Sequence, residues 1–193
     1  MEPINWPKSF TYAPTSIIRD IHPNFLFHYL WVNNDSISLL IETQSVHPHL
    51  QIKELKPPHP LAGKETFKGH VQHGLFALEK IQKNTELGEY VGEMCLVRPD
   101  DTSVENGVYL WTIIVRVNEP ALRIYSGKIA NELTFVNDYR GIQKKPNVSG
   151  KGIAHRGRCY FGYETIRDIE LGEELLIDYG DAWAKHWESK AIL

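Results

Sequence analysis

The sequence predicts one domain that consists mainly of β-strands. Its 193 residues are close to the length of ~150 residues that is typical of a single domain. Hydrophobic residues make up 42% of the chain, which is enough to form a core. Short segments rich in Val, Ile, Tyr, Phe and Trp alternate with Gly, Pro and Asn, and the pairs Asn106-Gly107 and Ser126-Gly127 are turn signals.

Eight segments rich in β-branched and aromatic residues are expected to form strands. They are Ser36 to Glu42, Leu75 to Leu78, Glu86 to Val97, Val108 to Val117, Leu122 to Tyr125, Leu133 to Val136, Tyr160 to Thr165 and Glu174 to Asp178. The segment from Asn24 to Val32 is so densely aromatic that a buried helix and a buried strand both remain open.

The last part of the chain predicts a short C-terminal helix, from Asp181 to Lys190. Trp183 and Trp187 lie four residues apart and therefore share one helical face. Asp181 is suited to cap the first turn of this helix.

A proline-rich stretch from Lys56 to Pro60 predicts a stiff, extended connection. It marks a soft boundary between an N-terminal flanking region, residues 1–66, and a main domain, residues 67–193. The composition of the flanking region indicates no role beyond packing or substrate selection.

The charge pattern argues against direct binding of nucleic acid. The net charge is −3, so no positive field surrounds the whole molecule. Residues 140–158 carry six Lys and Arg side chains and no acid, whereas residues 164–178 carry six Asp and Glu side chains and one Arg. The basic stretch lacks the aromatic residues that stack on bases, which favours a solvated loop over a nucleic-acid site.

The sequence also predicts an intracellular protein, nuclear or cytoplasmic, with no membrane span. No apolar run approaches the ~20 residues that a spanning helix needs, and the first residues lack the features of a secretory signal. Cys95 and Cys159 are the only cysteines, which excludes a disulfide framework and a cysteine-rich zinc cluster. His47 with His49, and His70 with His73, lack the spacing of a structural zinc site, so no metal is predicted.

Four segments in order along the chain carry the strongest signal. They are His73 to Ala77 (HGLFA), Ile81 to Glu93 (IQKNTELGEYVGE), Asn131 to Asp138 (NELTFVND) and Ile166 to Gly180 (IRDIELGEELLIDYG). Together they resemble the SET domain of protein-lysine N-methyltransferases. The resemblance implies a fold of several small sheets, in which the Asn131 and Ile166 segments pack through each other as a pseudoknot.

The resemblance implies transfer of a methyl group from S-adenosyl-L-methionine to a lysine amine of a protein, with a histone tail as one substrate. The cofactor wall is then expected at Gln72, His73 and Gly74, together with Asn137 and Asp138. Tyr179 is expected to border the cofactor, and Trp183 or Trp187 to cover it.

Two tyrosines are the expected catalytic residues by the same resemblance. Tyr179, in the Asp178-Tyr179-Gly180 ending, would orient the amine and face the methyl group. Tyr90 would line the lysine channel and bond to the amine. Glu173 and Glu174 are expected to attract a basic peptide.

The chain departs from the family pattern at two positions. Gln72 stands where the family commonly has glycine, and Asp138 stands where it commonly has histidine. These departures favour an alternative function, a catalytically silent SET-like module that binds a peptide or a partner. A third possibility, nucleic-acid binding through residues 140–158, would show a strong response to salt.

Overall fold

The computed structural model describes residues 3, 5–18, 49–63, 71–98, 110–114, 120–155, 158–181 and 184. The segments predicted at 24–32 and 36–42 lie outside these residues, as does most of the predicted C-terminal helix. In that helix the described residues include one helical bond, from the Ala184 amide to the Gly180 carbonyl at 3.2 Å.

Thirteen strands and one short 3₁₀-helix make up the described regular structure. In chain order they are β1 (Thr11–Tyr12), β2 (Ile17–Ile18), β3 (Leu50–Glu54), β4 (His73–Ala77), β5 (Glu86–Glu89), β6 (Glu93–Val97), β7 (Leu110–Ile114), β8 (Ala121–Tyr125), β9 (Ile129–Ala130), η2 (Glu132–Phe135), β10 (Asn137–Asp138), β11 (Val148–His155), β12 (Arg158–Thr165) and β13 (Leu176–Ile177). The predicted mainly β fold is confirmed.

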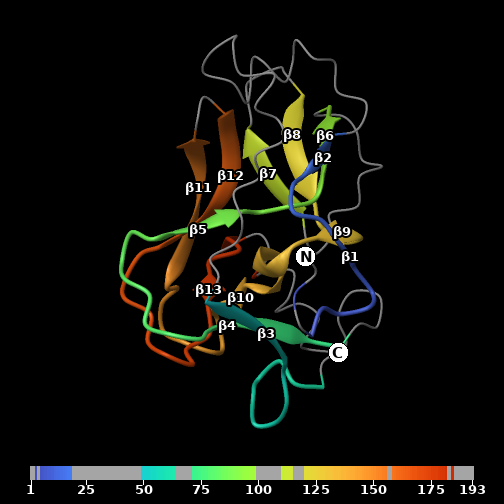
Figure 1. Ribbon diagram of the computed structural model, residues 1–193. Coiled ribbons are helices and arrows are strands. Elements are labelled where there is room, and N and C mark those ends of the chain that lie inside the picture. The colour runs from blue at the N-terminus through green and yellow to red at the C-terminus, as the bar shows by residue number, and fades with distance from the viewer. Residues whose placement is uncertain are drawn as a thin grey trace.

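The strands form several small sheets instead of one large sheet. Figure 1 shows the three-stranded sheet β11-β12-β5 on the left and the four-stranded sheet β2-β6-β8-β7 at the upper right. The pair β3-β4 lies below them, and β10 and β13 lie between β5 and β4. The pair β1-β9 completes the arrangement.

One predicted strand divides into two because the chain changes its pairing partner. Residues 86–89 pair with β12, whereas residues 93–97 pair with β8. Between them, Gly92 lies so close to the β8 end that an added Cβ would stand 2.6 Å from the Tyr125 carbonyl oxygen. A side chain there would clash with the end of β8, so glycine permits the chain to pass this point between β5 and β6.

The strand predicted at 133–136 is wrong: residues 132–135 form the 3₁₀-helix η2. Its Leu133, Thr134 and Phe135 are all buried. A short apolar run that is buried on every side has no period that separates a strand from a helical turn.

The basic stretch was expected to be a loop, and its second half is a strand. Residues 148–155 form β11 and pair with β12 over their whole length. Gly150 and Gly152, which resemble loop residues in the sequence, lie within this hairpin. An added Cβ at Gly150 would stand 2.7 Å from the Phe161 ring, so this glycine admits the ring to the sheet surface.

The N-terminal flanking region contributes strands to the sheets of the main domain. β1 pairs in parallel with β9, and β2 pairs in parallel with β6. β3 pairs with β4 in antiparallel register from Leu50 opposite Ala77 to Glu54 opposite His73. The described strands of residues 1–66 therefore pack against the main domain along three different edges.

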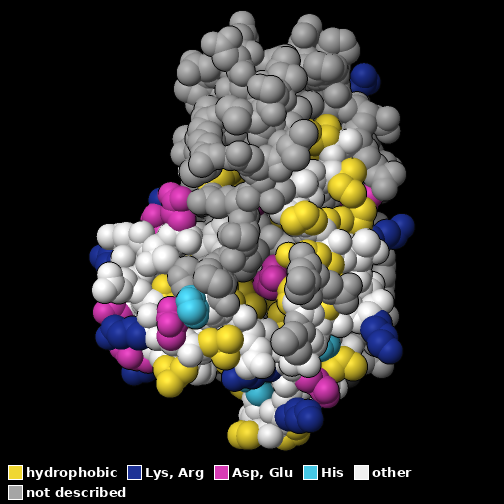
Figure 2. All heavy atoms as spheres, in the orientation of Figure 1, with side chains coloured by type: hydrophobic (Ala, Val, Ile, Leu, Met, Phe, Trp, Pro, Cys, Tyr) yellow, Lys and Arg dark blue, Asp and Glu magenta, His cyan; other side chains and the backbone are white. Residues whose placement is uncertain are grey.

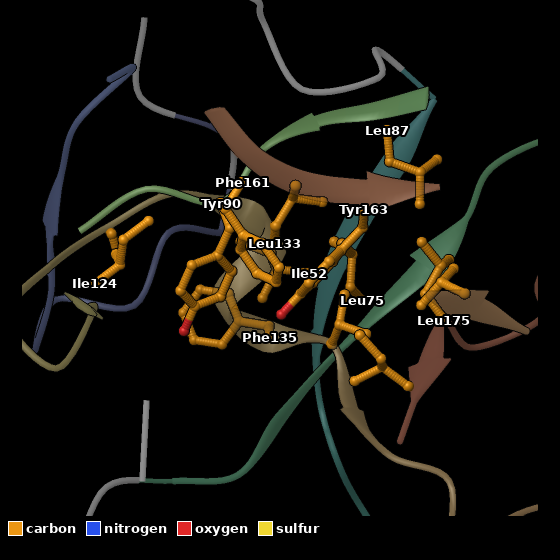
Figure 3. Packing of buried hydrophobic residues seen from close by; sticks show 14 of the residues in the cluster. Ile52, Leu75, Leu87, Tyr90, Ile124, Leu133, Phe135, Phe161, Tyr163 and Leu175 are labelled. Carbon is orange, nitrogen blue, oxygen red and sulfur yellow. The ribbon is translucent and has the colours of Figure 1, made fainter. Parts of the chain in front are cut away.

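A hydrophobic cluster among the described residues joins these sheets. It includes Ile52 of the flanking region and Leu75, Leu87, Ile124 and Leu175 of the main domain, all almost fully buried. Figure 3 shows Tyr90, Phe161 and Tyr163 at the centre of this cluster, with Ile124 on one side and Leu87 and Leu175 on the other.

Two distant segments cross near the C-terminus, as the pseudoknot expectation requires. β13 pairs in parallel with β10. On its other side, the Asn147 amide donates to the Leu176 carbonyl at 2.9 Å. β13 therefore bonds to both ends of the segment 137–147 and is enclosed by it, an exception to the rule that chains avoid threading.

The Asn147 side chain closes this crossing. It is fully buried, donates to the Glu174 carbonyl at 2.7 Å, and accepts from the Leu176 amide at 2.6 Å. We expect Asn147→Ala to lower the free energy of unfolding by about 2–4 kcal/mol, because it leaves two buried backbone groups unpaired. Denaturant unfolding measures this loss.

The matched control is Ser149→Ala on β11, where the serine is exposed and its hydroxyl has a long 3.4 Å contact. This change is expected to cost less than about 0.5 kcal/mol. Equal losses for the two variants would contradict the assigned role of Asn147.

Candidate functional site

Five aromatic side chains from four parts of the fold converge at the centre of the molecule. Phe161 and Tyr163 lie two residues apart on β12 and share one face of the sheet. Trp111 comes from β7, Tyr90 follows β5, and Tyr179 follows β13. We call these five residues the aromatic cluster.

The rings of the aromatic cluster pack edge to face or at a tilt, which are favourable arrangements for aromatic pairs. The centroid of Trp111 lies 5.2 Å from that of Phe161 and 6.1 Å from that of Tyr179. The centroid of Tyr90 lies 5.5 Å from that of Tyr163 and 6.4 Å from that of Trp111. Trp111 thus bridges the two predicted catalytic tyrosines.

The aromatic cluster also brings three phenol groups together. Burial raises the pKa of Tyr163 well above its ordinary value of 10, and the nearby phenols of Tyr90 and Tyr179 raise it further. The ring centroid of Tyr163 lies 6.1 Å from that of Trp111, in an edge-to-face arrangement. The buried Tyr163 hydroxyl is therefore neutral at physiological pH and can act as a hydrogen-bond donor.

Tyr179 is held at both its side chain and its main chain. Its hydroxyl donates to the Val136 carbonyl at 2.6 Å. Its backbone amide donates to Oδ2 of Asp138 at 2.8 Å. These two bonds fix the ring against the segment that carries Asn137, so the aromatic cluster ends at the expected cofactor wall.

Asp138 is a buried carboxylate that joins the two crossing segments. Both of its oxygens accept from Arg140, Oδ1 from the amide at 2.9 Å and Oδ2 from the guanidinium at 2.8 Å. Arg140 also pairs with Asp178 at 2.8 Å. Because Oδ2 bonds to the amide of Tyr179 as well, Asp138 positions that tyrosine. Its contact with the cofactor stays a prediction.

The expected cofactor wall begins at the start of β4. The Gln72 carbonyl accepts from the Leu55 amide at 2.9 Å. His73 is partly exposed, and its Nδ1 donates to the Val71 carbonyl at 2.8 Å. Burial lowers the pKa of His73 below its ordinary 6.5, so the ring is mainly neutral at pH 7.

Asn137 ties this wall to the C-terminal segment. Its side-chain amide donates to the His73 carbonyl and to Oε1 of Glu174, both at 2.9 Å. Oε1 of Glu174 in turn occupies the space beside Gly74, where an added Cβ would stand 2.5 Å from it. Gly74 therefore leaves room for a carboxylate.

The structure thus places the predicted residues in two adjoining groups. Tyr90 and Tyr179 lie in the aromatic cluster, whereas Gln72, His73 and Asn137 lie along the start of β4. The bond between Tyr179 and Val136 joins the two groups. Trp183 and Trp187 lie outside the described residues.

Sequence reasoning missed Trp111, Phe161 and Tyr163. The spacing of two between Phe161 and Tyr163, inside a strand that was predicted, is a signal for a shared face. No local signal indicates Trp111, because only the pairing of β7 with β8 brings it to the same place. Residues 166–180 were recognised, but the partners of Glu174 depend on the tertiary structure.

The expectation that Glu173 and Glu174 attract a basic peptide is wrong for Glu174. Its side chain is only 5% exposed and accepts from Asn137 and from His59. Glu173 pairs with Arg167 and also accepts from the Gln143 amide at 3.2 Å. Both carboxylates serve contacts within the protein.

Two cations of the basic stretch 140–158 are likewise engaged. Arg140 pairs with Asp138 and Asp178, and Lys151 pairs with Glu164. Figure 2 shows positive and negative side chains next to each other along the lower left of the described surface. These ion pairs reduce the charge that the stretch offers to phosphate groups.

The hydrogen bonds from Arg167 lower the pKa of Glu173 from 4.5 to about 2. Because the pKa of Glu173 is lower in the folded state, the ionised carboxylate stabilises the fold at pH values above the ordinary pKa of 4.5. This stabilisation is lost as the pH falls from about 4.5 towards 2. We expect Glu173→Gln to remove this part of the pH dependence, at a cost near neutral pH of about 1 kcal/mol for a partly exposed pair. Denaturant unfolding at pH 3, 4 and 7 measures the change.

The control is Glu79→Gln, since Glu79 is half-exposed and faces His49 at 3.4 Å. The control variant should follow the parent at all three pH values. A Glu173→Gln variant that also parallels the parent would contradict the assigned ion pair.

Within the part of the chain that the structure describes, no three His, Cys, Asp or Glu side chains cluster in a way that could hold a metal ion. No helix among the same residues has the length and hydropathy to cross a membrane.

Comparison with known proteins links this geometry to one family. The model of the SET domain matches residues 72–180. The histone-lysine N-methyltransferase MEDEA of Arabidopsis thaliana is 33% identical over 113 residues, which cover 55% of this chain and 15% of MEDEA. PR domain zinc finger protein 14 of Mus musculus is 27% identical over 171 residues, which cover 85% of this chain and 28% of that protein.

The fold has a counterpart among solved structures. The crystal structure of ATXR5 in complex with histone H3.1 mono-methylated on R26 superposes with a TM-score of 0.59 and 16% identity. The alignment covers 89% of this chain and 81% of that one. At this identity the likeness shows the fold. The chain spans less than a third of the length of the curated relatives described above.

Proposed function

The chain belongs to the SET-domain family, and on that premise we propose that it transfers a methyl group from S-adenosyl-L-methionine to the side-chain amine of a protein lysine. One observation carries this proposal. Tyr179 lies where the aromatic cluster meets the wall formed by His73 and Asn137, and its hydroxyl is fixed by the Val136 carbonyl. Such a junction suits two ligands that meet end to end.

The residues present fit this cofactor by the chemistry of their donors and acceptors. The main chain from Gln72 to Gly74, the imidazole of His73 and the amide of Asn137 offer neutral polar groups at the start of β4. They would hold the amino-acid and ribose parts of the cofactor. Trp183 and Trp187 are proposed as its cover. When bound, the cofactor supplies an electrophilic methyl group on a sulfonium centre.

The aromatic cluster would prepare the lysine for attack. A free lysine has a pKa of ~10.4, and the amine must be neutral to react. Rings of Tyr90, Trp111 and Phe161 exclude water, which lowers the pKa of an amine by desolvation. The hydroxyls of Tyr90 and Tyr179 would then orient the neutral amine, so that no strong base is needed.

Tyr179→Phe tests the proposed chemistry. We expect the variant to lose ~10²-fold or more of the rate of methyl transfer, because an oriented hydroxyl at the reacting centre is removed. The assay follows labelled methyl groups from S-adenosyl-L-methionine onto mixed histones and onto a cell lysate. Thermal unfolding shows whether the variant is folded.

Tyr125→Phe is the matched control, because Tyr125 lies on β8 outside the aromatic cluster. It should retain the parent rate within about threefold. A folded Tyr179→Phe protein that is as active as the parent would remove Tyr179 from the mechanism.

A histone is the proposed substrate, and association with chromatin in the nucleus follows from it. MEDEA is named a histone-lysine N-methyltransferase, as is the Schizosaccharomyces pombe relative, specific for lysine 4 of H3. The number of methyl groups transferred would depend on the volume of the proposed lysine channel.

The alternative is a catalytically silent module that binds a peptide or a partner. The contacts of Asp138 favour it, because both carboxylate oxygens already accept from Arg140 and the amide of Tyr179. Calorimetry with S-adenosyl-L-methionine separates the two functions. Heat of binding supports the enzyme, whereas its absence at high protein concentration supports the silent module.

A further inference from the structure

His59 lies in the proline-rich segment of the flanking region and reaches into the main domain. Its Nε2 is 2.9 Å from Oε2 of Glu174, although 115 residues separate them in sequence. The two side chains are 17% and 5% exposed. A contact this well shielded from solvent is stronger than an exposed pair and costs more when one partner is removed.

The second ring nitrogen of His59 fixes which nitrogen carries the proton. The Leu61 amide donates to Nδ1 at 3.2 Å. Since an accepting nitrogen carries no proton, Nε2 is the donor and Glu174 the acceptor. A neutral imidazole in this one tautomer satisfies both contacts, so the ring is locked in place from two sides.

Glu174 passes this constraint to the expected cofactor wall. While Oε2 accepts from His59, Oε1 accepts from the side-chain amide of Asn137 at 2.9 Å. The same amide donates to the His73 carbonyl at 2.9 Å. A continuous series of hydrogen bonds therefore runs from His59 through Glu174 and Asn137 to the main chain of β4.

The carboxylate of Glu174 fits at this place because position 74 is a glycine. Oε1 of Glu174 fills the space that a side chain at position 74 would need. On the main chain, the Asn147 amide group holds the Glu174 carbonyl at 2.7 Å. With the backbone of Glu174 held in this way, the direction of its carboxylate depends on His59 and Asn137.

We propose that His59 is a positioning residue that holds Glu174 and, through it, the Asn137 side chain in the orientation that binds the cofactor. The importance of this role for catalysis rests on the proposed function. The flanking region thereby completes the cofactor side of the site, although none of its residues belongs to the segments by which the family is recognised. Without His59 the carboxylate turns away from β4, and the amide of Asn137 loses an acceptor.

Two substitutions of His59 test the proposal. His59→Phe keeps the volume of a ring and removes both nitrogens, whereas His59→Gln keeps an amide that can donate to Glu174. We expect His59→Phe to raise the Kd for S-adenosyl-L-homocysteine about tenfold. A change of this size corresponds to the free energy of one hydrogen bond. His59→Gln should recover binding to within about threefold of the parent. Isothermal calorimetry gives these constants, and thermal unfolding confirms that each variant is folded.

His49→Phe is the matched control. His49 faces Glu79 at 3.4 Å, and the two side chains are about half exposed. Their pair lies outside the bonds that reach Asn137. This variant should bind S-adenosyl-L-homocysteine as the parent does.

The NMR signals of the Asn137 side-chain amide report on its position, and they can be measured in the absence of the cofactor. In the free protein, His59→Phe should shift these signals, His59→Gln should restore them, and His49→Phe should leave them unchanged. The positioning role is overturned if a folded His59→Phe protein shows unshifted Asn137 signals, or if it binds S-adenosyl-L-homocysteine with the same affinity as the parent. A parent that binds no cofactor overturns the proposed function, and the NMR result then still decides whether His59 orients Asn137.

Discussion

The crossing of β13 through the segment 137–147 is the constraint on which the rest of the site depends. β13 pairs with β10 on one side and with Asn147 on the other. A polypeptide held from both sides cannot shift its register by one residue without losing its backbone bonds. Tyr179 follows directly after this crossing, so its hydroxyl meets the Val136 carbonyl and its amide meets Asp138. The position of the phenol is therefore a consequence of the threading.

The flanking region is part of the same construction. β3 pairs with β4 along the strand that begins at the expected cofactor wall, and His59 bonds to Glu174 on the main domain. The four ordered segments that mark the family therefore do not by themselves complete the site. Residues outside those segments hold the start of β4 in place, and they give the proline-rich stretch a role beyond that of a connection.

The order of the four segments predicted the fold. The structure brings Tyr90 and Tyr179 together in the aromatic cluster and Asn137 into the adjoining group, and their roles stay predictions. Local sequence patterns predicted the wrong structure for η2, because its residues are buried and show no alternation of apolar and polar positions. They also failed at Gly150, a glycine within a strand that makes room for the Phe161 ring. They also failed for contacts over long sequence distances. Trp111 reaches the aromatic cluster only through the pairing of β7 with β8, and His59 reaches Glu174 across 115 residues. No window of sequence contains both partners of such a contact.

Hydrogen exchange of individual amides, measured by NMR on the folded protein, tests most directly whether the crossing holds the site. The amides of Leu176 and Tyr179 should exchange only through global unfolding, with the same free energy as the Leu175 amide, which donates to the Leu75 carbonyl in the core. Exchange of Leu176 and Tyr179 through a separate opening of lower free energy, while Leu175 stays protected, would contradict the claim that the threading fixes Tyr179.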